Sequence, residues 1–443
     1  MKYAIDKPKK LCYNEVVEIY FLEVLMSTIA DLSKKYPPLA KDSEAWEHRF
    51  DIAEEKMGKT AADALRKLYD FYGRDFYLWI AELYDPTRGA FYYANSARDN
   101  DNFLPDCEST CQALSLLKWL GMFPKSSMGI PDEDKPKLAK FIGDMQDPDD
   151  GYFYHEQWGK NIGSSRKGRD LSQCLELLRE MDTKPKYPTA LERLEALAVS
   201  EKPAEESQMP KHLLSKENML EYLDKLCKEN SHSIGHTLSS QTNQIKAVGM
   251  CDFVCDYLDK LQNPETGLWD EKPDYTSMSG IIKIGSFYGG SGRSINYAGK
   301  LIDSAMDVIC SDVNPLWGIY VFNPWGALGT AVRTHIAASG DDPEVARETY
   351  ARVYARVPEM IDATIRKIGL FRKPDGSFSY EQERSAPTTQ GVPVSLGLYE
   401  GDINGTAVAI HYLLGSLLPS LGLPKIPMFN ENDHARFMAA LKK

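Results

Sequence analysis

The chain has 443 residues, of which 43% are hydrophobic and 11% aromatic, and its formal net charge is −12. This hydrophobic content is enough for a large core, whereas the acidic balance and the lack of a basic stripe argue against a nucleic-acid partner. Glutamates interrupt the apolar run at 1–32, and no segment reaches the ~18 uncharged apolar residues of a membrane span. We therefore expect no signal peptide, no membrane partner, a cytoplasmic location and reduced cysteines.

One turn motif recurs along the chain: a proline, two residues, a glycine, one residue and an aromatic side chain. Full copies lie at 85–91, 147–153 and 263–269, a weaker copy at 314–320, and a shorter one at 373–378. The glycines are 62, 116, 51 and 58 residues apart, which indicates a unit of 50 to 60 residues with one copy missing near position 209. Such a period predicts repeated units that bury their apolar faces against one another.

A helical pattern precedes each motif and a more apolar helical pattern follows it, so the unit is expected to be a helical hairpin. The glycine should supply a positive backbone angle at the turn. The more apolar segments are expected to form an inner ring at 108–120, 170–181, 234–248, 277–288, 325–338 and 404–417. The more charged segments are expected outside it, at 61–83, 135–145, 216–228, 250–261, 297–309 and 344–368.

The predicted fold is therefore an all-α (α/α)6 toroid of six helical hairpins, forming one domain over residues 1–443. An extra helix is expected at 14–34. The segment 183–212 is rich in Lys, Pro and Glu and stands where the missing motif should be. It is expected to be a solvated insertion or a lid over the cavity mouth.

Two features resemble the terpenoid cyclase and protein prenyltransferase toroid superfamily. The glutamine-led copies at 146–153 and 262–269 look like its Q-x-x-x-(x)-G-x-W/F repeats. The helix openings DCEST at 106–110 and EGDINGT at 400–406 are similar to its acidic-then-threonine openings. The resemblance covers most of 60–420 and implies a toroid. The chain is also similar to toroidal glycan-cleaving enzymes, which implies a carbohydrate substrate.

The chemistries of that superfamily find poor matches in this chain. Class II cyclases protonate an alkene with the middle Asp of Asp-x-Asp-Asp, but the candidate at 147–150 lies inside a turn motif. Prenyltransferases bind zinc with an Asp-x-Cys pair, and Asp106-Cys107-Glu108 is out of register. An isoprenoid cyclase or prenyltransferase-like enzyme therefore stays as an alternative, and no cofactor is expected.

The favoured hypothesis is an enzyme that cleaves glycosidic bonds of oligosaccharides. Inner-helix N-termini converge on one mouth of a toroid, where free backbone N–H groups stabilise carboxylates. Glu108 and Asp402 open the first and last inner helices, which ring closure would make neighbours about 8–10 Å apart. We expect them to be the acid and base of an inverting glycoside hydrolase, supported by Asp106.

Other residues near the same mouth are expected to bind the sugar through ring stacking and polar contacts. They are Tyr93, Tyr154, His155, Trp158, Arg169, Asn323, Trp325 and Glu400. A lyase acting on a uronate would instead use Tyr275 and His236. We expect His236 near Asp106 and Asp402 across the mouth.

The pair His232 and His236 also has a metal-like spacing, but Gly235 disfavours a helix interior and no adjacent Glu completes a zinc pattern, so no metal is expected. A non-catalytic binding toroid is the third alternative.

Overall fold

The computed structural model describes residues 29–37, 39, 46, 48–124, 127–193 and 210–442. Helices account for 61% and strands for 4%, which places the protein in the all-α class. The strands of the described part form two short antiparallel ladders. One joins β1 (Tyr84–Asp85) to β2 (Ala90–Phe91), and the other joins β3 (Thr388–Thr389) to β4 (Val392–Pro393). No described helix is both long and apolar enough to cross a membrane.

The segments predicted as inner helices all form helices. They are α8 (Cys107–Trp119), α10 (Ser164–Glu180), α13 (Ser231–Ala247), α15 (Tyr275–Ser291), α17 (Ile319–Ala338), and the consecutive α19 (Ile403–Thr406), η4 (Ala407–Tyr412) and α20 (Leu413–Ser420). Each follows its predicted outer partner. The partners are α5 (Lys59–Tyr72) with α6 (Phe76–Glu82), α9 (Lys135–Met145), α12 (Lys216–Leu226), α14 (Cys251–Leu261), α16 (Ala298–Cys310) and α18 (Pro343–Gly369).

Smaller elements complete the described chain. They are α2 (Ile29–Lys35), α4 (Asp51–Met57), α7 (Asn95–Arg98), η1 (Asp132–Asp134), η3 (Lys211–Leu213) and α21 (Glu431–Leu441). Both α2 and α21 pack against α6. Most of the helix expected at 14–34 lies outside the described residues, and the described helix there begins at Ile29.

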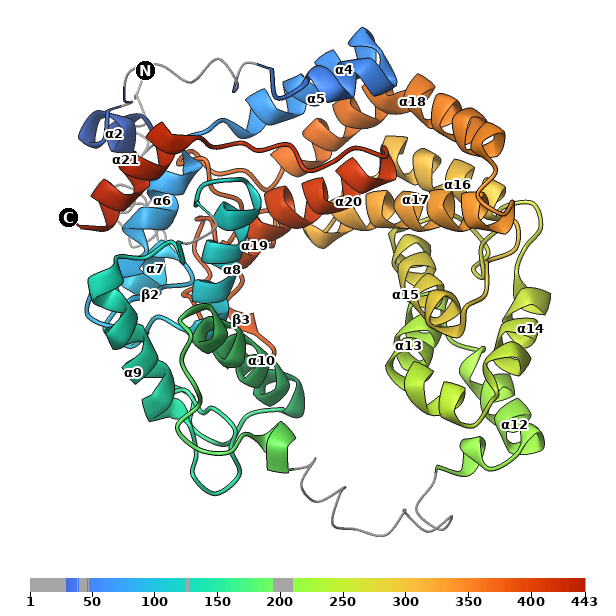
Figure 1. Ribbon diagram of the computed structural model, residues 1–443, viewed down its shortest axis with the longest axis horizontal. Coiled ribbons are helices and arrows are strands. Elements are labelled where there is room, and N and C mark those ends of the chain that lie inside the picture. Colours follow the sequence, from blue (N-terminus) through green and yellow to red (C-terminus); the bar gives the residue numbers. More distant parts are fainter. Residues whose placement is uncertain are drawn as a thin grey trace, which may run out of the picture.

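The inner helices contact one another in the order of the chain, and the last of them also packs on the first. α10 packs on α8, α8 on α19 and η4, α20 on α17, α17 on α15, and α15 on α13. Among the outer helices, α5 packs on α18 and α18 on α16. Figure 1 shows these helices following an arc from α10 through α8, α20, α17 and α15 to α13. The first and last inner helices are therefore neighbours, as the sequence predicts.

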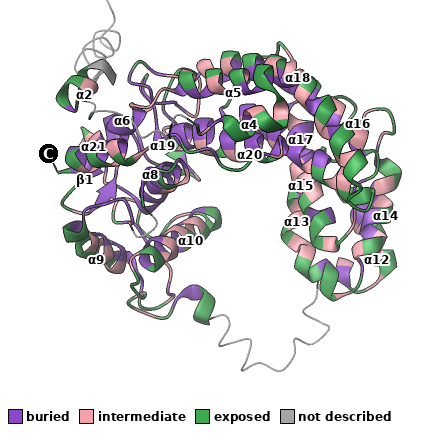
Figure 2. Ribbon diagram, turned by 45° about the horizontal axis from the view of Figure 1, so that its top comes forward, coloured by how far each residue is buried: buried purple, intermediate pink, exposed green. Residues whose placement is uncertain are grey.

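Burial follows this arrangement. Figure 2 shows buried residues gathered on α6, α8 and α17, whereas α12 and α18 carry many exposed ones. Trp79 and Trp325 are the largest of the fully buried side chains in the described part. The Trp325 indole donates a hydrogen bond of 3.0 Å to Thr364 Oγ1 of α18, which anchors α17 on its outer neighbour.

The turn glycines confirm the motif at four of its five positions. Gly89, Gly151, Gly267 and Gly376 have φ values of 69°, 77°, 73° and 82°. At Gly318, φ is −54° and the residue caps α17 in a helical conformation. The copy at 314–320 is thus not a turn of the same kind, because α17 begins at its sixth residue.

Several predicted helix bounds need correction. The segment predicted as one helix at 61–83 is two, because Gly73 has φ 69° and separates α5 from α6. Both α10 and α17 begin six residues before their predicted starts. The last inner helix contains a π-helix, η4, which hydrophobic periodicity does not reveal.

The start of the predicted insertion at 183–212 packs on the second turn motif. Gln146 accepts a hydrogen bond from the Tyr187 N–H and donates one to its carbonyl, each 2.8 Å long. In the third motif, Gln262 donates to the carbonyls of Gly267 and Asn296. The leading glutamine therefore ties each turn to a following segment. Residues 194–209 of the insertion lie outside the described residues.

Candidate functional site

Asp106 and Asp402 play the same structural role at neighbouring helix openings. The Asp106 carboxylate accepts from Ser109 N at 2.9 Å and caps α8, and Asp402 accepts from Gly405 N at 2.6 Å and caps α19. The threonine four residues later repeats the match. Thr110 Oγ1 accepts from Phe91 N at 2.9 Å, as Thr406 Oγ1 does from Phe378 N at 3.0 Å. The acidic-then-threonine opening is thus a device that binds the aromatic residue of the turn motif.

This repeat corrects the register of the proposed acid/base pair. Because Asp106 is equivalent to Asp402, the position equivalent to Glu108 is Asn404. Gln112 bridges the two helices, because its amide donates to Asn404 Oδ1 at 3.1 Å and lies 3.5 Å from Glu108 Oε1. Glu108 and Asp402 are on adjacent helices, as expected, but they are not matching residues of the repeat.

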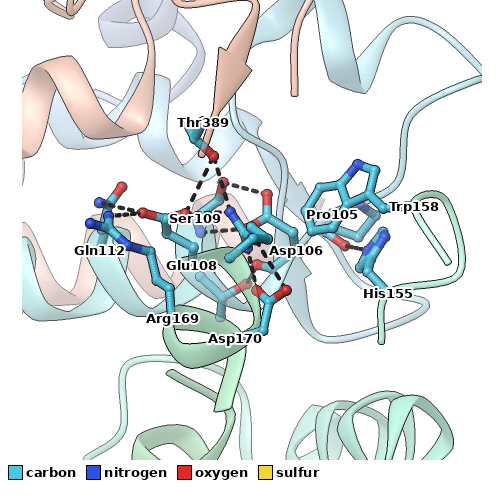
Figure 3. A network of polar contacts seen from close by, with 12 residues as sticks. Pro105, Asp106, Glu108, Ser109, Gln112, His155, Trp158, Arg169, Asp170 and Thr389 are labelled. Carbon is cyan, nitrogen blue, oxygen red and sulfur yellow. Dashed lines mark hydrogen bonds and ion pairs between the residues drawn. The ribbon is translucent and has the colours of Figure 1, made fainter. Parts of the chain in front are cut away.

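Glu108 belongs to a buried charge network shown in Figure 3. Its carboxylate pairs with Arg166 at 2.5 Å and with Arg169, and Thr389 Oγ1 lies 3.4 Å away. Arg166 also forms a bidentate pair with Asp170 one helical turn later. Arg166 is completely buried, whereas 40% of the Arg169 side chain is exposed. Arg169 is therefore the part of this network that a ligand can reach.

Burial alone would lower the pKa of Arg166, but the hydrogen bond to Asp170 and the nearby carboxylates raise it. The guanidinium therefore stays charged. Burial raises the pKa of Asp170 to about 6, although Arg166 opposes this shift.

Trp158 covers the other side of the network, since its ring lies 4.5 Å from the Arg166 guanidinium. The Trp158 ring also packs against His155, with centroids 4.2 Å apart, and His155 Nε2 contacts the Pro105 carbonyl at 3.1 Å. Figure 3 places both residues beside the loop that leads into α8. Burial lowers the pKa of His155. His155 is buried and Trp158 is half-buried. These two rings therefore pack around Arg166 and do not form an exposed surface for a sugar.

The carboxylates of Asp402 and Glu400 are buried and accept several hydrogen bonds. Asp402 is completely buried and accepts from Tyr380 N at 2.9 Å and from Ala386 N at 3.2 Å as well as capping α19. Burial raises the pKa of Asp402 to about 6 and that of Glu400 to about 7. Glu400 accepts from the backbone and hydroxyl of Ser96 and from Ser385. Both carboxylates hold the segment at 380–400 in place.

The other residues predicted to bind a sugar do not lie together on one surface. Tyr93 is buried, and its hydroxyl lies beside Asp402 without reaching hydrogen-bond geometry. Tyr154 donates to Asp150 at 2.6 Å within the second turn motif. Asn323 and Trp325 are buried in α17, so they do not line an exposed surface.

The lyase pair predicted from the sequence is not assembled with Glu108. Tyr275 donates to the Val313 carbonyl at 2.5 Å, and its ring stacks on Tyr320 at 5.2 Å. His236 is exposed on α13, where Nδ1 lies 3.3 Å from Lys283 Nζ of α15. Figure 1 places α13 on the opposite arm of the arc from α8. The expectation that His236 approaches Asp106 and Asp402 finds no support among the described contacts.

An aromatic surface beside Arg169 was not predicted from the sequence. It consists of Trp317, Tyr320, Phe322, Tyr380 and Tyr412, from the start of α17, the segment before β3 and the end of η4. Trp317 is 40% and Tyr412 38% exposed, and the other three rings are half-buried.

Four rings of this aromatic surface form two contacting pairs, and two of its tyrosines lie near the Arg169 charge. Trp317 packs on Tyr320 at 5.2 Å, and Phe322 on Tyr412 at 6.1 Å. Burial raises the pKa of both Tyr380 and Tyr412, and the nearby Arg169 charge opposes each shift. The Arg169 charge is therefore close enough to both tyrosines to affect their pKa values.

A sequence signal existed for part of this site. Arg166, Arg169 and Asp170 share one face of a helix at i, i+3 and i+4, but the helix was predicted to begin only at Asp170. Tyr412 is a polar-tipped ring in an otherwise apolar helix. No group of three or more residues suited to hold a metal ion occurs in the part of the chain that the structure describes.

Comparisons of this chain with protein-family models, with curated proteins and with solved structures find no match.

Proposed function

We propose that this protein is a carbohydrate-active enzyme that cleaves glycosidic bonds in an acidic oligosaccharide. The observation that carries the proposal is the aromatic surface beside a half-exposed arginine, Arg169, whose buried partner is Glu108. Exposed rings offer flat apolar faces with polar tips, which suit the apolar faces and hydroxyl groups of sugars. A half-exposed guanidinium matches a carboxylate with two parallel hydrogen bonds.

We further propose that the hairpins form an (α/α)6 toroid with this surface on its inner wall. The support is the order of helix contacts from α10 to α13, together with the contact of the first inner helix with the last. A closed ring would additionally require α10 to lie next to α13.

Elimination suits the site better than hydrolysis by Glu108 and Asp402. Glu108 is paired with two arginines, and Asp402 accepts three backbone N–H groups in full burial. Neither is free to protonate a leaving oxygen or to activate water. A uronate carboxylate on Arg169 would instead lie near Tyr380 and Tyr412, whose pKa values respond to the Arg169 charge.

In this reaction a base removes the proton from the carbon beside the uronate carboxylate. The bond from the neighbouring carbon to the glycosidic oxygen breaks, a carbon–carbon double bond forms, and the leaving oxygen takes up a proton. Arg169 stabilises the negative charge that develops on the carboxylate. The raised pKa values of Tyr380 and Tyr412 keep both hydroxyls protonated at neutral pH, so one of them suits the proton donor.

The test is a panel of neutral and uronate-containing oligosaccharides, followed by reducing ends and by the ultraviolet absorbance of an unsaturated product. We expect both signals to rise together, with uronates only. Reducing ends without absorbance would indicate hydrolysis and contradict the elimination route. No cleavage of any member would reject the enzyme in favour of a binding toroid.

A further inference from the structure

A cavity of about 380 Å³ lies between α8, α10 and the π-helix η4. Its volume falls at the lower end of the roughly 300–1,000 Å³ that small-molecule sites occupy. Trp119 provides an aromatic face, and its ring lies 5.3 Å from that of His411. Ser115 and Glu176 supply further polar groups. The cavity therefore combines one flat apolar face with several hydrogen-bonding groups.

Two lysines and two glutamates line this cavity, and one of the lysines has no carboxylate partner among the described residues. Lys425 Nζ lies 5.2 Å from the centre of the Trp119 ring, and no carboxylate of the described residues pairs with it. Lys118 lines the cavity too, but it pairs with Glu180 at 2.5 Å. Lys425 is thus a cation beside an aromatic face, and its charge is available to a ligand.

His411 adds a neutral polar group. Burial lowers its pKa to about 4, so the ring is uncharged at neutral pH and carries one donor and one acceptor. No residue of the described part forms a hydrogen bond with this ring. Such an imidazole can exchange hydrogen bonds with sugar hydroxyls.

The cavity and the aromatic surface are connected through neighbouring residues of η4. His411 lines the cavity, and the next residue, Tyr412, belongs to the aromatic surface. π-helical turns occur frequently at functional sites. Along α8, eleven residues separate Glu108 from Trp119, which corresponds to about 16 Å at 1.5 Å per residue. A ligand that contacts both places would have to span about this distance.

We infer that this cavity is a second subsite, which binds an acidic sugar ring of the same oligosaccharide by stacking on Trp119 and pairing with Lys425. The inference rests on the proposed function, since it takes the ligand to be a glycan. It adds that the substrate carries an acidic residue at a distance from the one at Arg169.

The test is calorimetric titration of the full-length chain with glucuronate, and with glucose as the neutral control. We expect glucuronate to bind more tightly than glucose. Trp119→Ala should weaken glucuronate binding roughly three- to tenfold. Lys425→Met should weaken it by up to about fivefold, and Lys260→Met, an exposed position on α14, should leave it unchanged.

Lys425 is exposed, so Lys425→Met keeps the test valid if Trp119→Ala unfolds the protein. Equal binding of glucuronate and glucose, or binding that depends on Arg169 and not on Trp119 or Lys425, would overturn the inference. The two proposals fail separately. Glucuronate binding through Trp119 and Lys425 without any cleavage would reject only the enzyme, whereas cleavage with unaltered binding in both variants would reject only the subsite.

Discussion

Glu108 carries a buried negative charge that Arg166 and Arg169 compensate. Removing one partner of such a network leaves the other charges buried and unpaired, which is costlier than losing an exposed ion pair. The sequence predicts a catalytic carboxylate at this position. The contacts indicate a structural role as well, because the network joins α8, α10 and Thr389.

We therefore predict that Glu108→Gln lowers the free energy of unfolding by about 3 kcal/mol. Urea denaturation followed by circular dichroism measures this change. Glu348→Gln, at an exposed position on α18, is the control and should change stability by less than about 0.5 kcal/mol. A Glu108→Gln protein as stable as the wild type would show that the arginines need no buried counter-charge.

Glu400 makes a separate prediction about pH. Its pKa is raised from 4.5 to about 7 in the folded protein, chiefly by burial. Between these two values the folded state binds more protons than the unfolded state, so stability falls as pH rises. Over this window the wild type should lose about 2–3 kcal/mol relative to Glu400→Gln. Parallel stability curves for the two proteins between pH 4.5 and 7 would contradict the assignment.

At the level of elements, the turns depend on close packing as well as on positive backbone angles. A Cβ at Gly151 would overlap with the Pro188 carbonyl oxygen, whereas a Cβ at Gly159 would meet nothing within 4 Å. Both glycines have positive φ, 77° and 62°. Gly151→Ala should therefore cost ~1–3 kcal/mol of stability and more than Gly159→Ala, as thermal unfolding would measure. Equal costs would mean that the backbone angle alone explains the motif.

The turn motif is the element that the sequence predicted best, because proline and glycine act locally. Helix starts were predicted less well. α10 begins at Ser164, but residues 164–169 are polar and show no apolar periodicity. The sequence pattern therefore predicts a helix that starts only at Asp170. Arg166 lies in this polar first turn, so the sequence pattern does not single it out. The π-helix η4 escaped because it changes the hydrogen-bond register and not the composition.

At the scale of the whole molecule, the repeat predicted the helical class and the contact between the first and last inner helices. Equivalent openings at Asp106 and Asp402 looked catalytic, but repetition there reflects a shared structural task, the capping of a helix and the binding of a turn. The aromatic surface unites residues far apart in the chain, such as Arg169 and Tyr412, so no local pattern could reveal it.

The most direct test of the account is the rate of unsaturated-product formation from a uronate oligosaccharide by Arg169→Met, compared with Arg179→Met from the same helix. Arg179 is exposed in the last turn of α10 and serves as a matched loss of charge. We predict that Arg169→Met lowers kcat/KM by roughly 10²–10³, because the charge developing on the substrate carboxylate loses its partner, and that Arg179→Met has wild-type activity. Equal rates for the two variants would contradict the assignment of the site.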